Sequence, residues 1–148
     1  MPDGRDRTSG YIADGVHRLQ VRVYYEDTDM SGAVYHANYL RFCERGRSDC
    51  LRLLGIKLHE PSGPGGFVVR RMACDFRKPA AIDDLLTVET RFREMAGARM
   101  ELQQSVLREG DTLFLADVTA ALLDRQGRPK RLPPELHAAV KSLLESKP

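Results

Sequence analysis

The densest group of reactive side chains lies in residues 24–39, which read YYEDTDMSGAVYHANY. Asp27 and Asp29 come just before Gly32, and His36 follows Asp29 by seven residues. A carboxylate can act as a nucleophile or a general base, and an imidazole can donate or accept a proton. If a helix begins near His36, its unpaired N–H groups and partial positive charge could stabilise a developing oxyanion.

The flanking patterns predict the elements that position this segment. Apolar and polar residues alternate from His17 to Glu26, as in a half-buried strand. After a polar turn, an apolar stripe with three- and four-residue steps runs from Tyr35 to Leu54 and indicates a long helix, which Gly55 ends. Gly46 lies inside that stripe, where it costs about 1 kcal/mol relative to Ala. We expect another backbone to be packed closely against the helix there.

The rest of the chain is typical of an antiparallel sheet. We expect residues 1–15 to be a disordered lead-in and residues 16–148 to form one domain. Within it, the pattern predicts a loop over 60–66, strands over 67–76, 85–95, 99–109 and 112–124, tight turns at 96–97 and 110–111, and a short helix over 132–144. This order favours an α+β fold, in which a sheet of about five strands wraps around the long helix. Such a sheet leaves a face or an edge that dimerisation would cover.

Composition excludes several classes of protein. A net charge of +2 is too small to indicate nucleic-acid binding, and no segment approaches the roughly 18 apolar residues of a membrane span, so we expect a cytoplasmic protein. Three Cys without a CxxC motif argue against a disulfide framework or a zinc site. Cys43 and Cys50 share one helix face, as core residues would. His17, His59 and His137 have no metal-ligand spacing, so we expect neither a metal nor a cofactor.

The pattern D-T-D-x-x-G-x-V-Y-H-x-x-Y over residues 27–39 resembles the signature of the 4-hydroxybenzoyl-CoA thioesterase family of hotdog-fold proteins. It is most similar to the Tol-Pal-associated acyl-CoA thioesterases of bacteria. The similarity extends over roughly residues 17–134 and includes Phe42, Glu44, Arg45, Leu51, residues 67–72, Pro79-Ala80 and Asp83-Asp84. The resemblance implies a hotdog fold and a homodimer or homotetramer with its sites at the subunit interface.

The resemblance also implies roles for individual residues. In this family the Asp that follows Thr or Cys in the motif is the catalytic carboxylate, which is Asp29 here. It would act as a nucleophile, through a mixed anhydride, or as a general base on water. His36 would assist, and Tyr35 would contribute through its backbone N–H. Asp27 is expected to hold the turn, and Glu44 to form a structural ion pair.

A basic cluster follows the loop over 60–66. Arg70, Arg71, Arg77 and Lys78 lie on or just after one predicted strand. The guanidinium group suits phosphate, so Arg70, Arg71 and Arg77 are candidate contacts for the phosphates of coenzyme A. A solvated strand face is the alternative interpretation of the same cluster.

The predicted activity is therefore hydrolysis of a thioester carried by coenzyme A or by acyl carrier protein. A thioester is activated, so a carboxylate and an oxyanion hole can suffice, and no G-x-S-x-G motif occurs. The alternative is a non-hydrolytic module that binds acyl thioesters or serves as an envelope-associated scaffold. A metal-dependent phosphatase built on the D-T-D segment is disfavoured, because the chain is short and lacks the downstream Lys and Asp motif.

Overall fold

The computed structural model describes residues 8–57 and 66–145. Its elements are β1 (Tyr11–Ala13), β2 (Val16–Arg22), the 3₁₀ helix η1 (Tyr25–Asp27), α1 (His36–Leu53), β3 (Gly66–Phe76), β4 (Leu85–Ala96), β5 (Arg99–Arg108), β6 (Asp111–Leu123) and α2 (Pro134–Glu145). The predicted long helix and the four strands after it are confirmed to within one residue at each end. The first predicted strand ends early, at Arg22, because η1 occupies its last residues.

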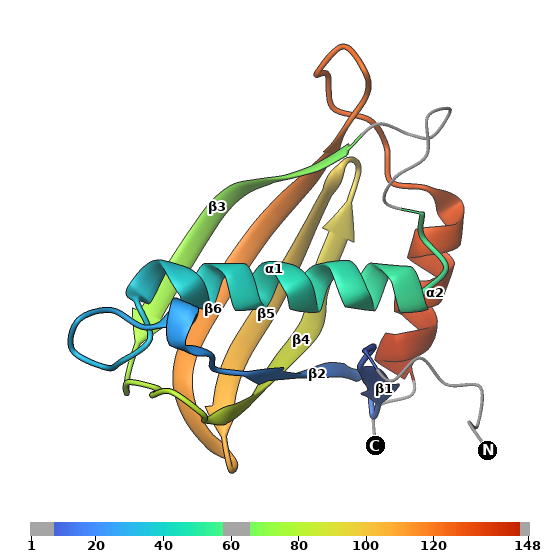
Figure 1. Ribbon diagram of the computed structural model, residues 1–148. Helices are drawn as coiled ribbons and strands as arrows, with labels where there is room; N and C mark the ends of the chain where they lie inside the picture. The colour runs from blue at the N-terminus through green and yellow to red at the C-terminus, as the bar shows by residue number, and fades with distance from the viewer. Residues whose placement is uncertain (1–7, 58–65, 146–148) are drawn as a thin grey trace.

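The strands form one antiparallel sheet in the order β1-β2-β4-β5-β6-β3. The sheet curves around α1, which crosses its concave face, while α2 packs at the far end of the sheet, next to β4 (Figure 1). This is the predicted α+β hotdog arrangement, with six strands where about five were expected.

The additional strand comes from the predicted lead-in, so the expectation of disorder through residue 15 is wrong for Tyr11–Ala13. These residues pair with β2, and Asp49 of α1 secures the segment before them. The Asp49 Oδ2 atom accepts hydrogen bonds from the Gly10 N–H at 2.8 Å and from His17 Nε2 at 2.7 Å. The sequence pattern missed this strand because its three residues are too few to show alternation.

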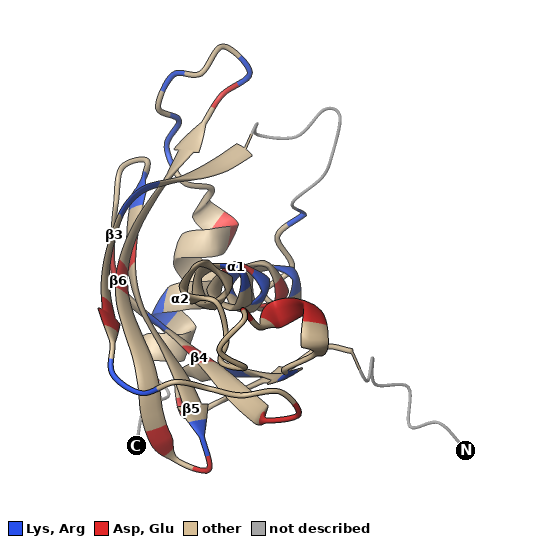
Figure 2. Ribbon diagram, turned by 60° about the vertical axis from the view of Figure 1, so that its left-hand side comes forward, with Lys and Arg blue, Asp and Glu red and all other residues tan. Residues whose placement is uncertain are grey.

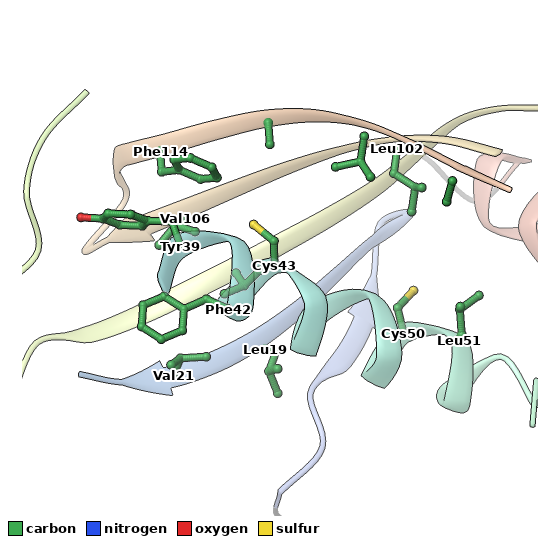
Figure 3. Packing of buried hydrophobic residues seen from close by; sticks show 14 of the residues in the cluster. Leu19, Val21, Tyr39, Phe42, Cys43, Cys50, Leu51, Leu102, Val106 and Phe114 are labelled. Atoms are coloured by element: carbon green, nitrogen blue, oxygen red, sulfur yellow. The ribbon is translucent and has the colours of Figure 1, made fainter. Parts of the chain in front are cut away.

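The core lies between α1 and the concave face of the sheet (Figure 3). Cys43 and Cys50 are buried there, as predicted, and burial raises the pKa of each thiol to about 12. Gly46 faces the sheet, and the atoms that leave no room for a larger residue are side-chain atoms of β4 and β5. The expectation that another backbone would lie against the helix at this position is therefore wrong. A Cβ at Gly46 would lie 2.9 Å from Val88 Cγ1 and 3.3 Å from Gln104 Nε2.

Both β-hairpin turns lie one residue away from their predicted positions. The β4–β5 turn is at 97–98, because Ala96 pairs with Arg99, and the β5–β6 turn is at 109–110, because Arg108 pairs with Asp111. Gly97 has φ +60°, and residues 109 and 110 both have positive φ, as two-residue hairpin turns require.

One edge of the sheet is long and exposed. The eleven residues of β3 pair with β6 on one side only, and nearly all of them are exposed. Val68, Val69 and Phe76 are 40%, 44% and 49% exposed, which is unusual for large apolar side chains on a strand. The predicted loop over 60–66 lies, except for Gly66, outside the described residues.

Candidate active site

The reactive segment forms a closed turn between η1 and α1. The Asp29 N–H donates to the Ala33 carbonyl at 2.9 Å, and the Gly32 N–H donates to the Asp29 carbonyl at 3.1 Å. Thr28 and Val34 form a bridge at the base of the turn. Gly32 has φ +84°, a left-handed conformation that glycine adopts without strain. The backbone thus holds Asp29 at one corner of a tight turn.

The Asp29 side chain is exposed, and Ser31 orients it. The Ser31 hydroxyl donates to Asp29 Oδ1 at 2.5 Å, and the Ser31 N–H donates to the same oxygen at 2.8 Å. The hydroxyl contact first and the N–H contact second lower the pKa of Asp29 below its usual 3.8, with a smaller contribution from the charge of His36. Since both bonds are to Oδ1, Oδ2 is left available for chemistry. Asp29 is therefore an ionised, oriented carboxylate at neutral pH.

The start of α1 lies just after this turn and provides backbone N–H donors. The Tyr35 N–H is already bonded to the Asp27 carbonyl at 3.0 Å, so it does not supply the free donor expected of it. Along the described chain, no backbone carbonyl accepts the N–H of His36 or of Ala37, the first two residues of α1. The structure therefore moves the candidate oxyanion hole from the N–H of Tyr35 to those of His36 and Ala37.

Asp27 holds the turn, as predicted. Its Oδ2 accepts the Tyr24 N–H at 2.9 Å, and its carbonyl accepts both the Tyr35 N–H and the Asn38 side-chain amide, the latter at 2.9 Å. The two bonds to the Asp27 carbonyl tie η1 to the start of α1, and the bond to Oδ2 closes η1 itself, so the Asp27 carboxylate is used in structure.

The connection between β3 and β4 is hydrogen-bonded to the residues just before α1 and to α1 itself. The Val34 N–H donates to the Ala80 carbonyl at 2.8 Å, and the Ala80 N–H donates to the Tyr39 hydroxyl at 3.0 Å. The Asp84–Arg108 ion pair, at 2.7 Å, secures the end of the same connection. The buried Tyr39 thus links α1 to this connection through its hydroxyl group.

Asp29 and His36 line two neighbouring depressions. The first has a volume of about 440 Å³ and is lined by Tyr25, Thr28, Asp29, Met30, Gly32 and Ile82. The second has a volume of about 280 Å³ and is lined by Val34, His36, Tyr39, Phe76, Arg77, Lys78 and Pro79. The exposed His36 ring contacts the rings of Tyr35 and Phe76, with centroid separations of 4.4 Å and 6.2 Å.

The structure divides the predicted arginine cluster. Arg77 lies beside His36 in the second depression, where it pairs with Asp75 at 2.8 Å. Arg71 pairs in register with Thr119 on the sheet face away from α1, and Arg70 occupies a β-bulge just before it. Charged residues lie at several positions along β3 and β6 (Figure 2). Within one chain, only Arg77 of the three is brought close to the reactive segment.

Two further residues correct or extend the sequence interpretation. Glu44 is exposed and makes no ion pair among residues 8–57 and 66–145, so the expected structural ion pair is wrong. Ser31 was missed, although a Ser two residues after an Asp in a turn is a recognisable signal for this hydrogen bond.

Across the described ranges, no group of His, Cys, Asp or Glu could hold a metal ion. No described helix is long and apolar enough to cross a membrane.

The fold and the site together define the class of protein. A curved sheet around a central helix, with an oriented carboxylate in the turn that leads into that helix, is an arrangement suited to acyl transfer from a thioester. The thioesterase superfamily model matches residues 31–115, more than half of the chain, and the chain belongs to this family.

Relatives and solved structures agree with this assignment. The acyl-CoA thioesterase YbgC of Haemophilus influenzae is 42% identical over 137 residues, covering 89% of this chain and 99% of the relative. A probable thioesterase from Bartonella henselae has a TM-score of 0.76 at 46% identity, covering 80% of this chain and 99% of the other. A Thermus thermophilus thioesterase complexed with coenzyme A and Zn has a TM-score of 0.72 at 26% identity, covering 88% of this chain and 95% of the other.

Proposed function

We propose that this protein hydrolyses acyl-CoA thioesters, with Asp29 as the reacting carboxylate and the N–H groups of His36 and Ala37 as the oxyanion hole. The observation that carries the proposal is the Asp29 carboxylate, oriented by Ser31 in the turn that leads into α1, whose first two N–H groups have no backbone acceptor among the described residues. The names of the H. influenzae relative and of the T. thermophilus complex support coenzyme A as the carrier.

The reaction consumes one water and yields a carboxylic acid and the free thiol of the carrier. In the nucleophilic route, Asp29 Oδ2 attacks the thioester carbon and the thiolate leaves, and water then cleaves the resulting mixed anhydride. In the general-base route, Asp29 takes a proton from water as the water attacks, and that proton passes to the leaving thiolate. In both routes the carbonyl oxygen becomes negative, and the helix N–H groups stabilise it. His36 would assist from the second depression.

The substrate and its surroundings follow from this proposal. Arg77, and Arg70 or Arg71 when a second chain is present, remain candidate contacts for the phosphates of coenzyme A. Acyl carrier protein is a second possible carrier for the same thioester. A homodimer or homotetramer, and a cytoplasmic location, remain predictions.

The test replaces Asp29 with Asn, which retains the size of the side chain and removes its charge. An amide is neither a useful nucleophile nor a useful base at neutral pH, so kcat should fall by about 10²-fold or more. His36→Ala should reduce kcat less, because it is proposed to assist. The measurement is thiol release from short, long and aromatic acyl-CoAs, with circular dichroism to confirm folding.

Asp14→Asn is the matched control, because Asp14 is an exposed Asp in the distant β1–β2 turn. It should leave kcat unchanged. If folded Asp29→Asn kept near wild-type kcat, the carboxylate mechanism would be wrong. If the wild-type protein bound acyl-CoA without releasing thiol, the non-hydrolytic binding module would be the better description.

A further inference from the structure

A groove between α1 and the start of β3 lies outside the site described above. Its volume is about 320 Å³, and its apolar lining comes from Leu51, Phe67, Val68, Val69, Met100 and Ala120. Glu44, Arg47 and Ser48 of α1 are the polar side chains along it. An apolar body with a polar group at one wall is the usual form of a site that orients a small organic ligand.

Arg47 is held in place from behind by a buried amide. Its Nη1 donates to Gln104 Oε1 at 2.8 Å. Gln104 is fully buried, and its Nε2 donates to the Cys43 carbonyl and to Thr90 Oγ1, both at 2.9 Å. These bonds fix which way the Gln104 amide faces, and therefore fix the position of the Arg47 guanidinium.

The charge of Arg47 has no counter-charge in direct contact. The half-buried guanidinium makes no ion pair in the described part of the chain, and its one hydrogen bond is to a neutral amide. Burial lowers the pKa of Arg47, which reflects the loss of water around its charge. A partly desolvated cation with unused donors is complementary to a carboxylate, which a guanidinium can bind through two parallel hydrogen bonds.

Glu44 also lines the groove, but it does not neutralise Arg47. It is exposed and lies beyond ion-pair distance of the guanidinium. Water and salt screen an exposed charge, whereas a direct hydrogen-bonded contact with a half-buried group is screened much less. The attraction of a ligand carboxylate to Arg47 should therefore exceed its repulsion by Glu44.

The exposed β3 edge indicates what would enter the groove. When two copies of one strand pair antiparallel about a two-fold axis, the start of each lies beside the end of the other. The start of β3 lines the groove, and Phe76 at its end contacts His36. In a dimer paired through β3, the groove of one copy would therefore open beside the α1 N-terminus of the other.

We propose that this groove receives the acyl group of the thioester and that Arg47 selects acyl groups ending in a carboxylate. The inference rests on the proposed function and on a dimer paired through β3. A charge-assisted hydrogen bond of this kind should favour the carboxylate-ended ligand by about 10- to 100-fold over an uncharged analogue of equal length.

The test measures binding without turnover. In the full-length Asp29→Asn background, dissociation constants are measured by calorimetry for matched pairs: succinyl- and butyryl-CoA, adipoyl- and hexanoyl-CoA, and suberoyl- and octanoyl-CoA. Arg47→Met keeps the apolar stem and removes the charge. Arg47→Lys keeps the charge and loses the planar fork, and serves if Arg47→Met does not fold. Arg45→Met is the matched control, because Arg45 is exposed on the same helix and lies outside the groove lining.

For at least one of the three pairs, we expect the carboxylate-ended acyl-CoA to bind at least tenfold more tightly than its uncharged partner. Arg47→Met should bring that ratio near one, Arg47→Lys should reduce it, and Arg45→Met should leave it unchanged. Tighter binding of the uncharged member at every length, or a ratio that survives both Arg47 substitutions, would overturn the inference while leaving thioester hydrolysis intact. If no acyl-CoA binds, and the wild-type protein releases no thiol, both the inference and the proposed function fail.

Discussion

In the proposed mechanism Asp29 is the reacting carboxylate, and Ser31 holds one of its oxygens with two hydrogen bonds. These bonds stabilise the charged form, because an ionised carboxylate is the better acceptor. A nucleophilic or basic carboxylate must be ionised to act, and the lowered pKa of Asp29 extends the ionised state to more acidic pH. Ser31 is thus a positioning residue that also sets the acidic limit of the reaction.

The pH profile of Ser31→Ala tests this role. The pKa of Asp29 lies below 3.8 in the native protein, so activity should be lost only as the pH falls below that value. Removing the hydroxyl deletes the largest cause of the shift, so the pKa should rise and the acidic limb of kcat/KM should move to higher pH. The measurement is kcat/KM against pH for both proteins.

Ser142→Ala on α2 is the control for a general loss of stability at low pH, because Ser142 is exposed and remote from the turn. Its acidic limb should match that of the wild-type protein. An unchanged limb in Ser31→Ala would show that another group sets the acidic limit.

At the scale of elements, α1 contributes both to the candidate site and to the core. Its N-terminus presents the N–H groups of the site, and its inner face packs on the sheet around Gly46. There the side chains of Val88, Thr90 and Gln104 approach so closely that a methyl group would lie 2.9 Å from Val88 Cγ1. The absence of a side chain lets Gln104 reach the Cys43 carbonyl, so the glycine sets the depth at which the helix sits.

Gly46→Ala should therefore destabilise the protein, although alanine favours a helix. The gain in helix propensity is at most about 1 kcal/mol. Overpacking a core typically costs about 1–3 kcal/mol, and the β-branched Val88 has little rotamer freedom with which to move away. We expect a net loss of about 0–2 kcal/mol in the free energy of unfolding, from the difference of these two effects.

Urea denaturation measures this loss. Arg45→Ala, at the exposed neighbouring position of α1, is the control and should change stability by less than about 0.5 kcal/mol. A Gly46→Ala variant more stable than the wild-type protein would mean that the helix moves away from the sheet at little cost.

For the whole molecule, the exposed β3 edge is the feature that a single chain leaves unexplained. An unpaired edge of eleven residues with exposed apolar side chains is an aggregation hazard unless another chain covers it. A second copy paired through β3 would extend the sheet and bury these side chains. It would also place two sites across one interface.

Val68→Lys tests this assembly. Val68 is 40% exposed near the start of β3, and the substitution would place a Lys charge in each half of the paired edge, where burial in the interface is costly. We expect the wild-type protein to be at least a dimer at micromolar concentration and Val68→Lys to dissociate more readily, by at least about tenfold. Light scattering after size exclusion measures both. Leu144→Lys, at a comparably exposed apolar position on α2, is the control, and a stable wild-type monomer would contradict the assembly.

The sequence by itself determined the long helix, the strands after it, the hotdog class and the segment that carries Asp29. The helix and the strands follow from short-range rules, since apolar periodicity and Gly at the end of a helix are local. The hotdog class and the role proposed for Asp29 rest on the family resemblance of the motif over residues 27–39. The function of Asp27 in the turn was also predictable, because its carboxylate reaches the Tyr24 N–H three residues away. Ser31 could have been found by the same local reasoning.

Only the tertiary structure decided which groups are free to act. The Tyr35 N–H is used by the Asp27 carbonyl, which leaves the N–H groups of the following residues as the donors. Asp49 meets Gly10 across 39 residues, and Arg47 meets Gln104 across 57. Contacts over such distances arise when the sheet closes around α1, and no local pattern records them. The carboxylate proposed to react can therefore be found in the sequence, whereas the N–H groups proposed as oxyanion donors and the groove between α1 and β3 can be identified only in the folded chain.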